Sequence, residues 1–210
     1  RTVGFCYVAL VGWRWAAAAL GKAVEDVDVT LAGLNHFSWL LAVRDRRTGE
    51  DLYPKLRLVV ESSDLPPLTR KYFRETGYLP ASGEDHFGEY VPFDDVFGTP
   101  APEFGHGTRE ERAARRLKLI RIAGGEGDWR ALHHSWERPM DYVNAVVRDK
   151  RTHFDFLNVP NCGAIDGLAG DMIVEVPAEV DADGAKPAQI GRLPEAIERL
   201  VKPAAEALHW

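Results

Sequence analysis

The sequence has few cysteines, no long apolar run and no excess of positive charge, and each shortage excludes a class of protein. Its two cysteines, Cys6 and Cys162, cannot form the disulfide framework of a small extracellular domain, so we expect a reducing, cytoplasmic compartment. No apolar run reaches the roughly 20 residues needed to span a bilayer, because the longest candidate is interrupted by Arg14. The net charge of −6 offers no basic surface to nucleic acid or to an anionic membrane.

A dinucleotide-binding signature is also missing. The glycine cluster at residues 124–127 follows a predicted helix rather than a strand, and it lacks the G-x-G-x-x-G spacing that cradles a pyrophosphate. We therefore predict no NAD site within this chain. The sequence begins with Arg1 and runs at once into a strand-like segment, so we expect the natural start to lie upstream.

The residues that are present favour one domain of mixed secondary structure. With 210 residues, of which 45% are hydrophobic, the chain can bury a sizeable core. Residues 3–10, rich in Val, Phe and Tyr, predict a buried strand, and the Ala-rich residues 13–23 predict a helix. Four further strands are expected at residues 28–31, 37–44, 153–159 and 172–180.

Helix signals occur mainly in the second half of the chain. Thr108 and Glu111 have the spacing of a capping box, and Pro139 suits the first turn of another helix. A last helix over residues 193–208 is expected to break near Pro203, and Pro177 predicts an edge or a break in its strand. Because strands and helices do not alternate regularly, we predict an α+β fold.

Cys6 and the pair Asn35-His36 form the first candidate constellation. A thiolate and an imidazole can share a transition metal, and the two predicted strands could bring them together. On spacing alone, a core cysteine and a loop histidine account for the same residues more simply. The metal site is therefore one of two open interpretations at this point.

A second constellation lies in the irregular segment of residues 77–92. Glu84, Asp85, His86 and Glu89 fall within six positions. Adjacent carboxylates, if partly buried, raise one pKa and produce a base that works near neutral pH. The simpler alternative is a polar loop with an acid that caps a helix. The spacing of the residues in the predicted polar turn at 158–163 does not identify a ligand.

Six blocks of the sequence resemble family 4 of the glycoside hydrolases and occur in the family's order. The G-L-N-H-x-x-W and V-E-V-P blocks are the most specific, and the pattern is most similar to the α-galactosidase, α-glucosidase and α-galacturonidase branch. The resemblance implies a lactate/malate dehydrogenase C-terminal-domain-like fold without the Rossmann domain. The blocks are residues 4–6, 32–39, 76–92, 138–142, 158–165 and 174–177 continuing to 191–194.

The resemblance implies an NAD- and manganese-dependent α-glycosidase with an unusual reaction. In that family NAD oxidises the sugar at C3, a base removes the C2 proton, and the glycosidic oxygen is eliminated. A divalent metal stabilises the developing charge. Cys6 and His36 match the family's metal ligands, whereas NAD is expected only with a nucleotide-binding domain outside this chain.

The same resemblance assigns the reacting and substrate-binding groups. Glu84 falls where the base for C2 is expected, and its neighbour Asp85 is an alternative for that role. Asn35 and His86 match positions close to the substrate. The partners implied are therefore a glycoside substrate, the missing nucleotide-binding domain and a second copy of the chain.

Two departures from the family keep other functions open. Tyr7 stands where the family has a histidine after the metal cysteine, and the nucleotide-binding half is absent, so we expect a domain over residues 1–210 that is truncated at both ends. A non-catalytic remnant that binds sugar or metal is one alternative. A 2-hydroxy-acid dehydrogenase C-terminal domain is another, but it requires His-Gly-Asp, whereas here His106-Gly107 precedes Thr108.

Overall fold

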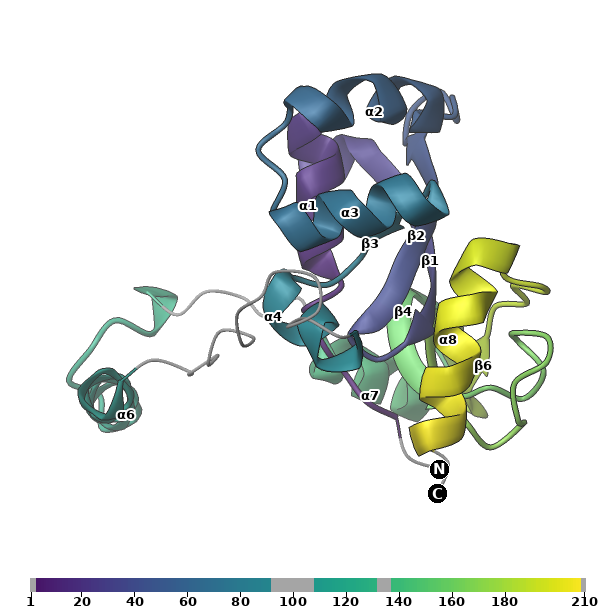
Figure 1. The fold of residues 1–210 in the computed structure, drawn as a ribbon. Helices are drawn as coiled ribbons and strands as arrows, with labels where there is room; N and C mark the ends of the chain where they lie inside the picture. The colour runs from purple at the N-terminus through teal and green to yellow at the C-terminus, as the bar shows by residue number, and fades with distance from the viewer. Residues whose placement is uncertain (1–2, 92–107, 132–136, 209–210) are drawn as a thin grey trace.

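A six-stranded antiparallel sheet forms the centre of the computed structural model, which describes residues 3–91, 108–131 and 137–208 (Figure 1). The strands follow the order β3-β2-β1-β5-β4, and β6 also pairs with β5. The predicted α+β class is confirmed. The strands are β1 (Val27–Leu34), β2 (Phe37–Asp45), β3 (Leu79–Pro80), β4 (Thr152–Pro160), β5 (Ile173–Asp181) and β6 (Gly184–Pro187).

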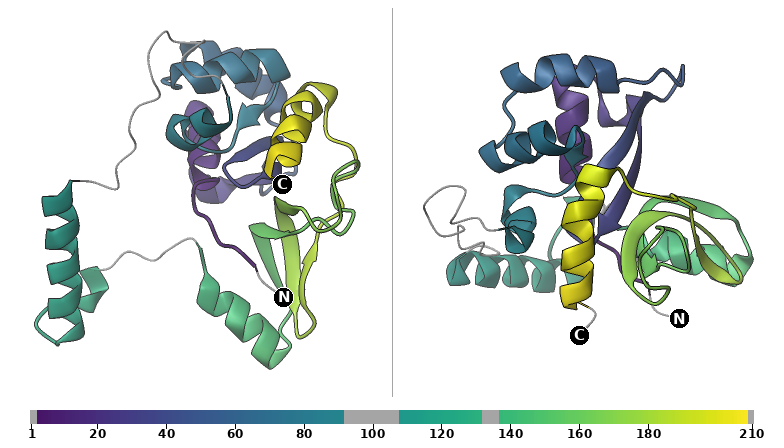
Figure 2. Two further views of the ribbon diagram at one scale, coloured as in Figure 1. Left: turned by 60° about the horizontal axis from the view of Figure 1, so that its bottom comes forward. Right: turned by 45° about the vertical axis from the view of Figure 1, so that its right-hand side comes forward.

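Helices surround this sheet, with α1, α2 and α3 grouped over the end that holds β2 and β3 (Figures 1 and 2). The α-helices are α1 (Leu10–Ala19), α2 (Tyr53–Val59), α3 (Pro67–Thr76), α4 (Glu84–Phe87), α6 (Arg109–Ala123), α7 (Pro139–Arg148) and α8 (Glu195–Leu208). The short 3-10 helices are η1 (Val24–Asp26), η2 (Val60–Ser62), η3 (Gly88–Tyr90) and η4 (Trp129–Ala131).

The sheet separates two apolar clusters, because alternate residues of a strand point to opposite faces. In β2, Leu40 packs with α1 and α2, in a cluster that includes the fully buried Trp13. Its neighbour Trp39 packs instead with β4, β5 and α8, in a cluster that includes Ile197. Burial on both faces fixes the pairing of β1 with β2, whose register shifts once, between Thr30 and Leu31. The β1–β2 hairpin is therefore a rigid support for whatever its turn carries.

The strand predicted at residues 3–10 is wrong. Only Gly4 pairs with the sheet, through two backbone hydrogen bonds to Asn158 of 2.9 and 3.0 Å. The chain then turns, and α1 begins at Leu10, three residues before the helix predicted from Trp13. Buried strands and buried helix starts share the same apolar composition, so periodicity could not separate them over so short a run.

Pro177 and Pro203 both lie inside secondary-structure elements that continue past them. Pro177 is in β5, which is an interior strand, opposite the irregularity where the β4–β5 register shifts between Phe154 and Leu157. The predicted edge or break is therefore wrong, and the proline is accommodated where the ladder already loses pairing. Pro203 lies inside α8, which runs unbroken to Leu208, so the break predicted there is also wrong.

The helix α6 differs from the others because none of its residues is buried (Figures 1 and 2). Its capping box between Thr108 and Glu111 is present as predicted. In the part of the chain that the structure describes, no helix combines the length and apolarity needed to cross a bilayer. Pro92 and the pair His106-Gly107 lie outside the described residues.

Candidate functional site

The turn of the β1–β2 hairpin presents Asn35 and His36. Leu34 pairs directly with Phe37, so the turn contains only these two residues. His36 has a φ of 65°, a left-handed conformation that is uncommon for residues other than glycine and is enriched at Asn, Asp and His. Gly33 precedes the turn, and a Cβ there would lie 2.3 Å from the carbonyl oxygen of Phe37, so only glycine allows this close return.

Cys6 reaches the same turn from the N-terminal segment. The Gly4–Asn158 backbone pair places this segment beside β4, and Cys6 Sγ then lies 3.2 Å from His36 Nε2. The two predicted metal ligands, which are thirty positions apart in sequence, are thus in direct contact. Their role as ligands stays a prediction.

Burial changes the protonation of both groups. It raises the pKa of the Cys6 thiol to about 11, an effect that a backbone hydrogen bond at Val8 partly opposes. Burial also lowers the pKa of His36, as does the neighbouring imidazole of His86. At neutral pH the histidine is therefore the neutral, metal-binding form, whereas the thiol holds a proton that a metal would have to displace.

The segment α4–η3 closes the other side of His36. The rings of His36 and His86 have centroids 4.2 Å apart. Possible ligand atoms of His36, His86 and Glu89 all lie within 4.8 Å of one another, so Glu89 joins the candidate metal group. Asp85 lies 3.6 Å from His86 Nε2. Glu89 stood three positions after His86 in the acidic segment, and that helical spacing was the signal available in the sequence.

Glu84 has a structural partner. Its Oε1 accepts a hydrogen bond from the backbone N–H of Leu68, in the first turn of α3. A carboxylate at this place satisfies an amide that has no partner within the helix. The capping interpretation of the acidic segment therefore describes this contact, and the role of Glu84 as a base stays a prediction.

Asn35 is held by contacts on two sides. Its side-chain Oδ1 accepts a 3.1 Å hydrogen bond from Asn158 Nδ2, and its backbone oxygen accepts one of 2.9 Å from the Tyr90 hydroxyl. These contacts fix the turn between β4 and η3. Whether Asn35 and His86 touch a substrate stays a prediction.

Two polar residues beneath the turn were not selected from the sequence. Glu175 is completely buried in β5, and Ser38 Oγ donates a 2.7 Å hydrogen bond to its Oε2. Burial raises the pKa of Glu175 to about 7, although the bond from Ser38 opposes the shift. The signal was a lone acid in the apolar run Val174–Val176, inside the V-E-V-P block.

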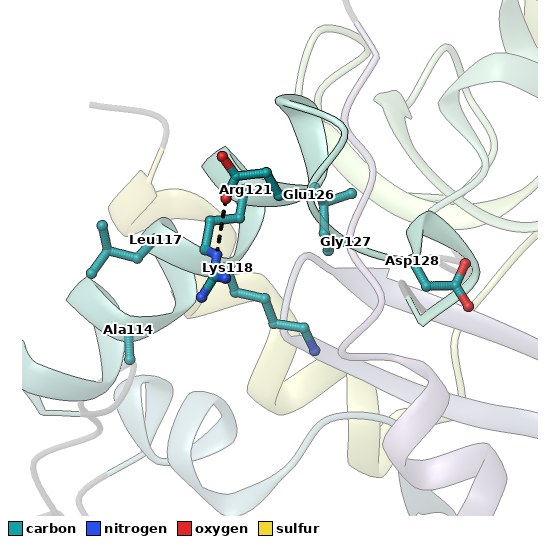
Figure 3. A pocket seen from close by; sticks show the side chains of 8 residues that line it. Ala114, Leu117, Lys118, Arg121, Glu126, Gly127 and Asp128 are labelled. Carbon is teal, nitrogen blue, oxygen red and sulfur yellow. Dashed lines mark ion pairs between the residues drawn. The ribbon is translucent and has the colours of Figure 1, made fainter.

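A separate pocket of about 430 Å³ lies between α6 and residues 126–128, away from these groups (Figure 3). Its walls combine apolar atoms such as those of Leu117 with an ion pair of 3.4 Å between Arg121 and Glu126. None of the six residues predicted for the site lines it. The groups around His36 are therefore a better candidate for an active site than this pocket.

Sequence comparisons identify the family of the chain. Residues 31–209 match the Family 4 glycosyl hydrolase C-terminal domain. The phospho-alpha-glucosidase PagL of Clostridium acetobutylicum is 27% identical over 218 aligned residues, which cover 92% of this chain and 48% of that protein. An alpha-galactosidase of Bacillus subtilis is 25% identical over 95% of this chain and 48% of its own length. The chain spans about half the length of these relatives.

Solved structures share the fold. The crystal structure of lplD from Bacillus subtilis matches with a TM-score of 0.81 and 22% identity, over 99% of this chain and 54% of that one. A 6-phospho-alpha-glucosidase from gut microorganisms, solved in complex with NAD and Mn2+, matches with a TM-score of 0.72 and 24% identity. The match covers 96% of this chain and 50% of that protein. The predicted family and fold are confirmed.

Proposed function

Because the chain belongs to the family 4 glycosyl hydrolases, we propose that it forms the metal- and substrate-binding part of an NAD- and manganese-dependent α-glycosidase. The reaction would proceed by oxidation at the sugar C3, loss of the C2 proton and elimination of the glycosidic oxygen. The relatives are about twice as long as this chain, so NAD would be bound by a domain outside these 210 residues.

The metal would be held by Cys6 and His36, and His36 also belongs to a group with His86 and Glu89 whose possible ligand atoms lie within 4.8 Å of one another. A thiolate, imidazoles and a carboxylate together suit a first-row transition metal, and Mn2+ is the ion present in the solved 6-phospho-alpha-glucosidase. The buried His86 Nδ1 has no hydrogen-bond partner among the described residues, which supports an occupant on this side of the imidazole pair. When bound, the metal supplies Lewis-acid stabilisation of negative charge on a substrate oxygen.

The base that removes the C2 proton would be one of the carboxylates of α4. Glu84 is occupied by the Leu68 amide, whereas Asp85 faces His86 at 3.6 Å and remains one third exposed. A carboxylate that can reach both a substrate and a neighbouring imidazole can accept a proton and share its charge. Of the two predicted acids, we therefore favour Asp85 as the base and Glu84 as its support.

The observation that carries the proposal is the 3.2 Å contact between Cys6 Sγ and His36 Nε2, beside the imidazole of His86. Titration calorimetry of the whole chain with Mn2+ under reducing conditions tests it. Cys6→Ser should lower the Mn2+ affinity by at least about 100-fold, since changing even an outer partner of a ligand costs 10–100-fold.

Cys162 provides a matched control. It is exposed, and its backbone N–H bonds to Gly170 in the connection between β4 and β5, so Cys162→Ser should bind Mn2+ as tightly as the parent. An equal loss in both variants would indicate non-specific thiol binding. Unchanged affinity in Cys6→Ser would remove Cys6 from the site.

A further inference from the structure

A row of polar residues crosses the sheet directly under the candidate site. Ser38 pairs with Gly33, Gly33 with Glu175, and Glu175 with Asn158. Residues that are directly opposite in antiparallel strands place their side chains on the same face. Ser38, Glu175 and Asn158 therefore share one face, and the missing side chain of Gly33 leaves the space across which Ser38 reaches Glu175.

Two buried oxygens in this row lack a donor. Glu175 Oε1 and Asn158 Oδ1 have no hydrogen-bond partner among the described residues, although both side chains are almost fully buried. An unpaired buried polar atom costs about 1–3 kcal/mol, so two of them on adjacent strands require an explanation. Both atoms are acceptors when Glu175 is ionised, and one proton between them would satisfy both.

The backbone brings these two side chains close together. The N–H and C=O groups of Asn158 both bond to Gly4, on the side of β4 away from β5. The Asn158–Glu175 pair is therefore a non-hydrogen-bonded pair of the ladder, the type in which opposed side chains are closest. A carboxyl group and a carboxamide at such positions are within reach of each other.

We propose that Glu175 is a positioning residue that carries a proton on Oε1 and donates it to Asn158 Oδ1, so that Asn158 Nδ2 is turned toward Asn35. The hydrogen bonds then run from Ser38 to Glu175, from Glu175 to Asn158 and from Asn158 to Asn35, which adjoins His36. Without this donor, the Asn158 amide can rotate and release the turn that carries a candidate ligand.

The surroundings of Glu175 favour the neutral form. Burial raises its pKa to about 7, and no cationic side chain contributes to that shift. The titratable groups that sense its charge are the Cys6 thiol, on the N-terminal segment, and the Tyr90 hydroxyl, in η3. An anionic Glu175 would raise the pKa of both, whereas a protonated Glu175 leaves the Cys6 thiol easier to ionise when a metal binds.

Infrared spectroscopy of the full chain, with glutamate labelled in its side-chain carboxyl group, tests the position of the proton. At about pH 6, a protonated-carboxyl C=O band should be present in the parent and absent from Glu175→Gln. No such difference between the two proteins would overturn the inference. This measurement needs neither metal nor activity.

Mn2+ titration tests the positioning role, which rests on the proposed function. Glu175→Gln keeps a donor toward Asn158 and should bind Mn2+ within about threefold of the parent, whereas Glu175→Met should lose about 10–100-fold. Equal losses in the two variants would show that no directed hydrogen bond is involved. A parent chain that binds no Mn2+ would contradict the proposed function, while the infrared band still decides the place of the proton.

Discussion

The two sides of the candidate site rest on different kinds of structure. The sheet wall, which we define as Cys6, Asn35, His36, Asn158 and Glu175, comes from β4, β5, the turn between β1 and β2, and the segment that Gly4 joins to β4. The helical wall, defined as Asp85, His86 and Glu89, lies on α4 and η3, which contain only 4 and 3 residues.

Burial differs between the two walls only at the extremes, because Cys6, Asn35, His36, Asp85 and His86 are all partly buried. Glu175 is 1% exposed and Asn158 7%, whereas the side chain of Glu89 is 59% exposed. Groups on paired strands are held by many neighbours, while those on single helical turns can adjust to a ligand. The paired strands of the sheet wall therefore give the proposed ligand His36 a rigid base, whereas the proposed ligands His86 and Glu89 lie on short helical turns that can adjust.

The largest expected effect concerns the helical wall. In a complete enzyme rebuilt with a nucleotide-binding domain, Asp85→Asn should slow exchange of the substrate's C2 proton with solvent by about 10²–10⁴-fold, because a positioned base contributes that much. Hydride transfer at C3 should persist. Deuterium incorporation, followed by mass spectrometry, measures the loss.

Glu84→Gln is the matched control, because glutamine can still accept the hydrogen bond from Leu68. It should exchange at nearly the parental rate. A large loss in Glu84→Gln alone would return the role of base to Glu84. Undiminished exchange in both variants would place the base elsewhere.

A smaller effect concerns the sheet wall. The pKa of the Cys6 thiol is raised to about 11, so the thiol is protonated at neutral pH and must lose its proton when a metal binds. The Mn2+ affinity of the chain should therefore rise by about tenfold per pH unit between about pH 6 and 9. Calorimetry in buffers of different ionisation heats would count the released proton, and Cys6→Ser should show a flatter pH dependence.

The smallest effect concerns the support beneath the helical wall. Glu84→Ala removes the acceptor for the Leu68 amide and should lower the free energy of unfolding by about 1 kcal/mol, as loss of an N-terminal cap does. Glu84→Gln should be close to neutral. Urea unfolding measures both variants, and equal stability of Glu84→Ala and the parent would show that the cap contributes nothing.

The elements that were predicted correctly are those whose local signals agree with their surroundings. The strands β1, β2, β4 and β5 and the capping box of α6 follow directly from apolar runs and from the pair Thr108 and Glu111. The first segment failed, because residues 3–10 form one bridge at Gly4 and then the start of α1. Its apolar residues are buried in either structure, so burial gave no means to choose.

The contacts at the candidate site were predicted in part, and their roles stay predictions. Cys6 and His36 were selected through the resemblance, and the structure brings them into contact. Their spacing in the sequence alone favoured a core cysteine and a loop histidine with no shared role. Glu89 and Glu175 were missed for different reasons. The first was one of several acids in an irregular segment, and the second is distinguished only by what surrounds it on neighbouring strands.

The sequence by itself determined the family, the α+β class and the chemistry of the side chains near the turn, because these depend on residue type and order along the chain. Tertiary structure alone decided which of those side chains meet. The contact of Cys6 with His36 depends on a bridge between Gly4 and Asn158, and the burial of Glu175 depends on pairing with both β1 and β4. Such contacts join positions far apart in the chain, and no local pattern encodes the distance between them.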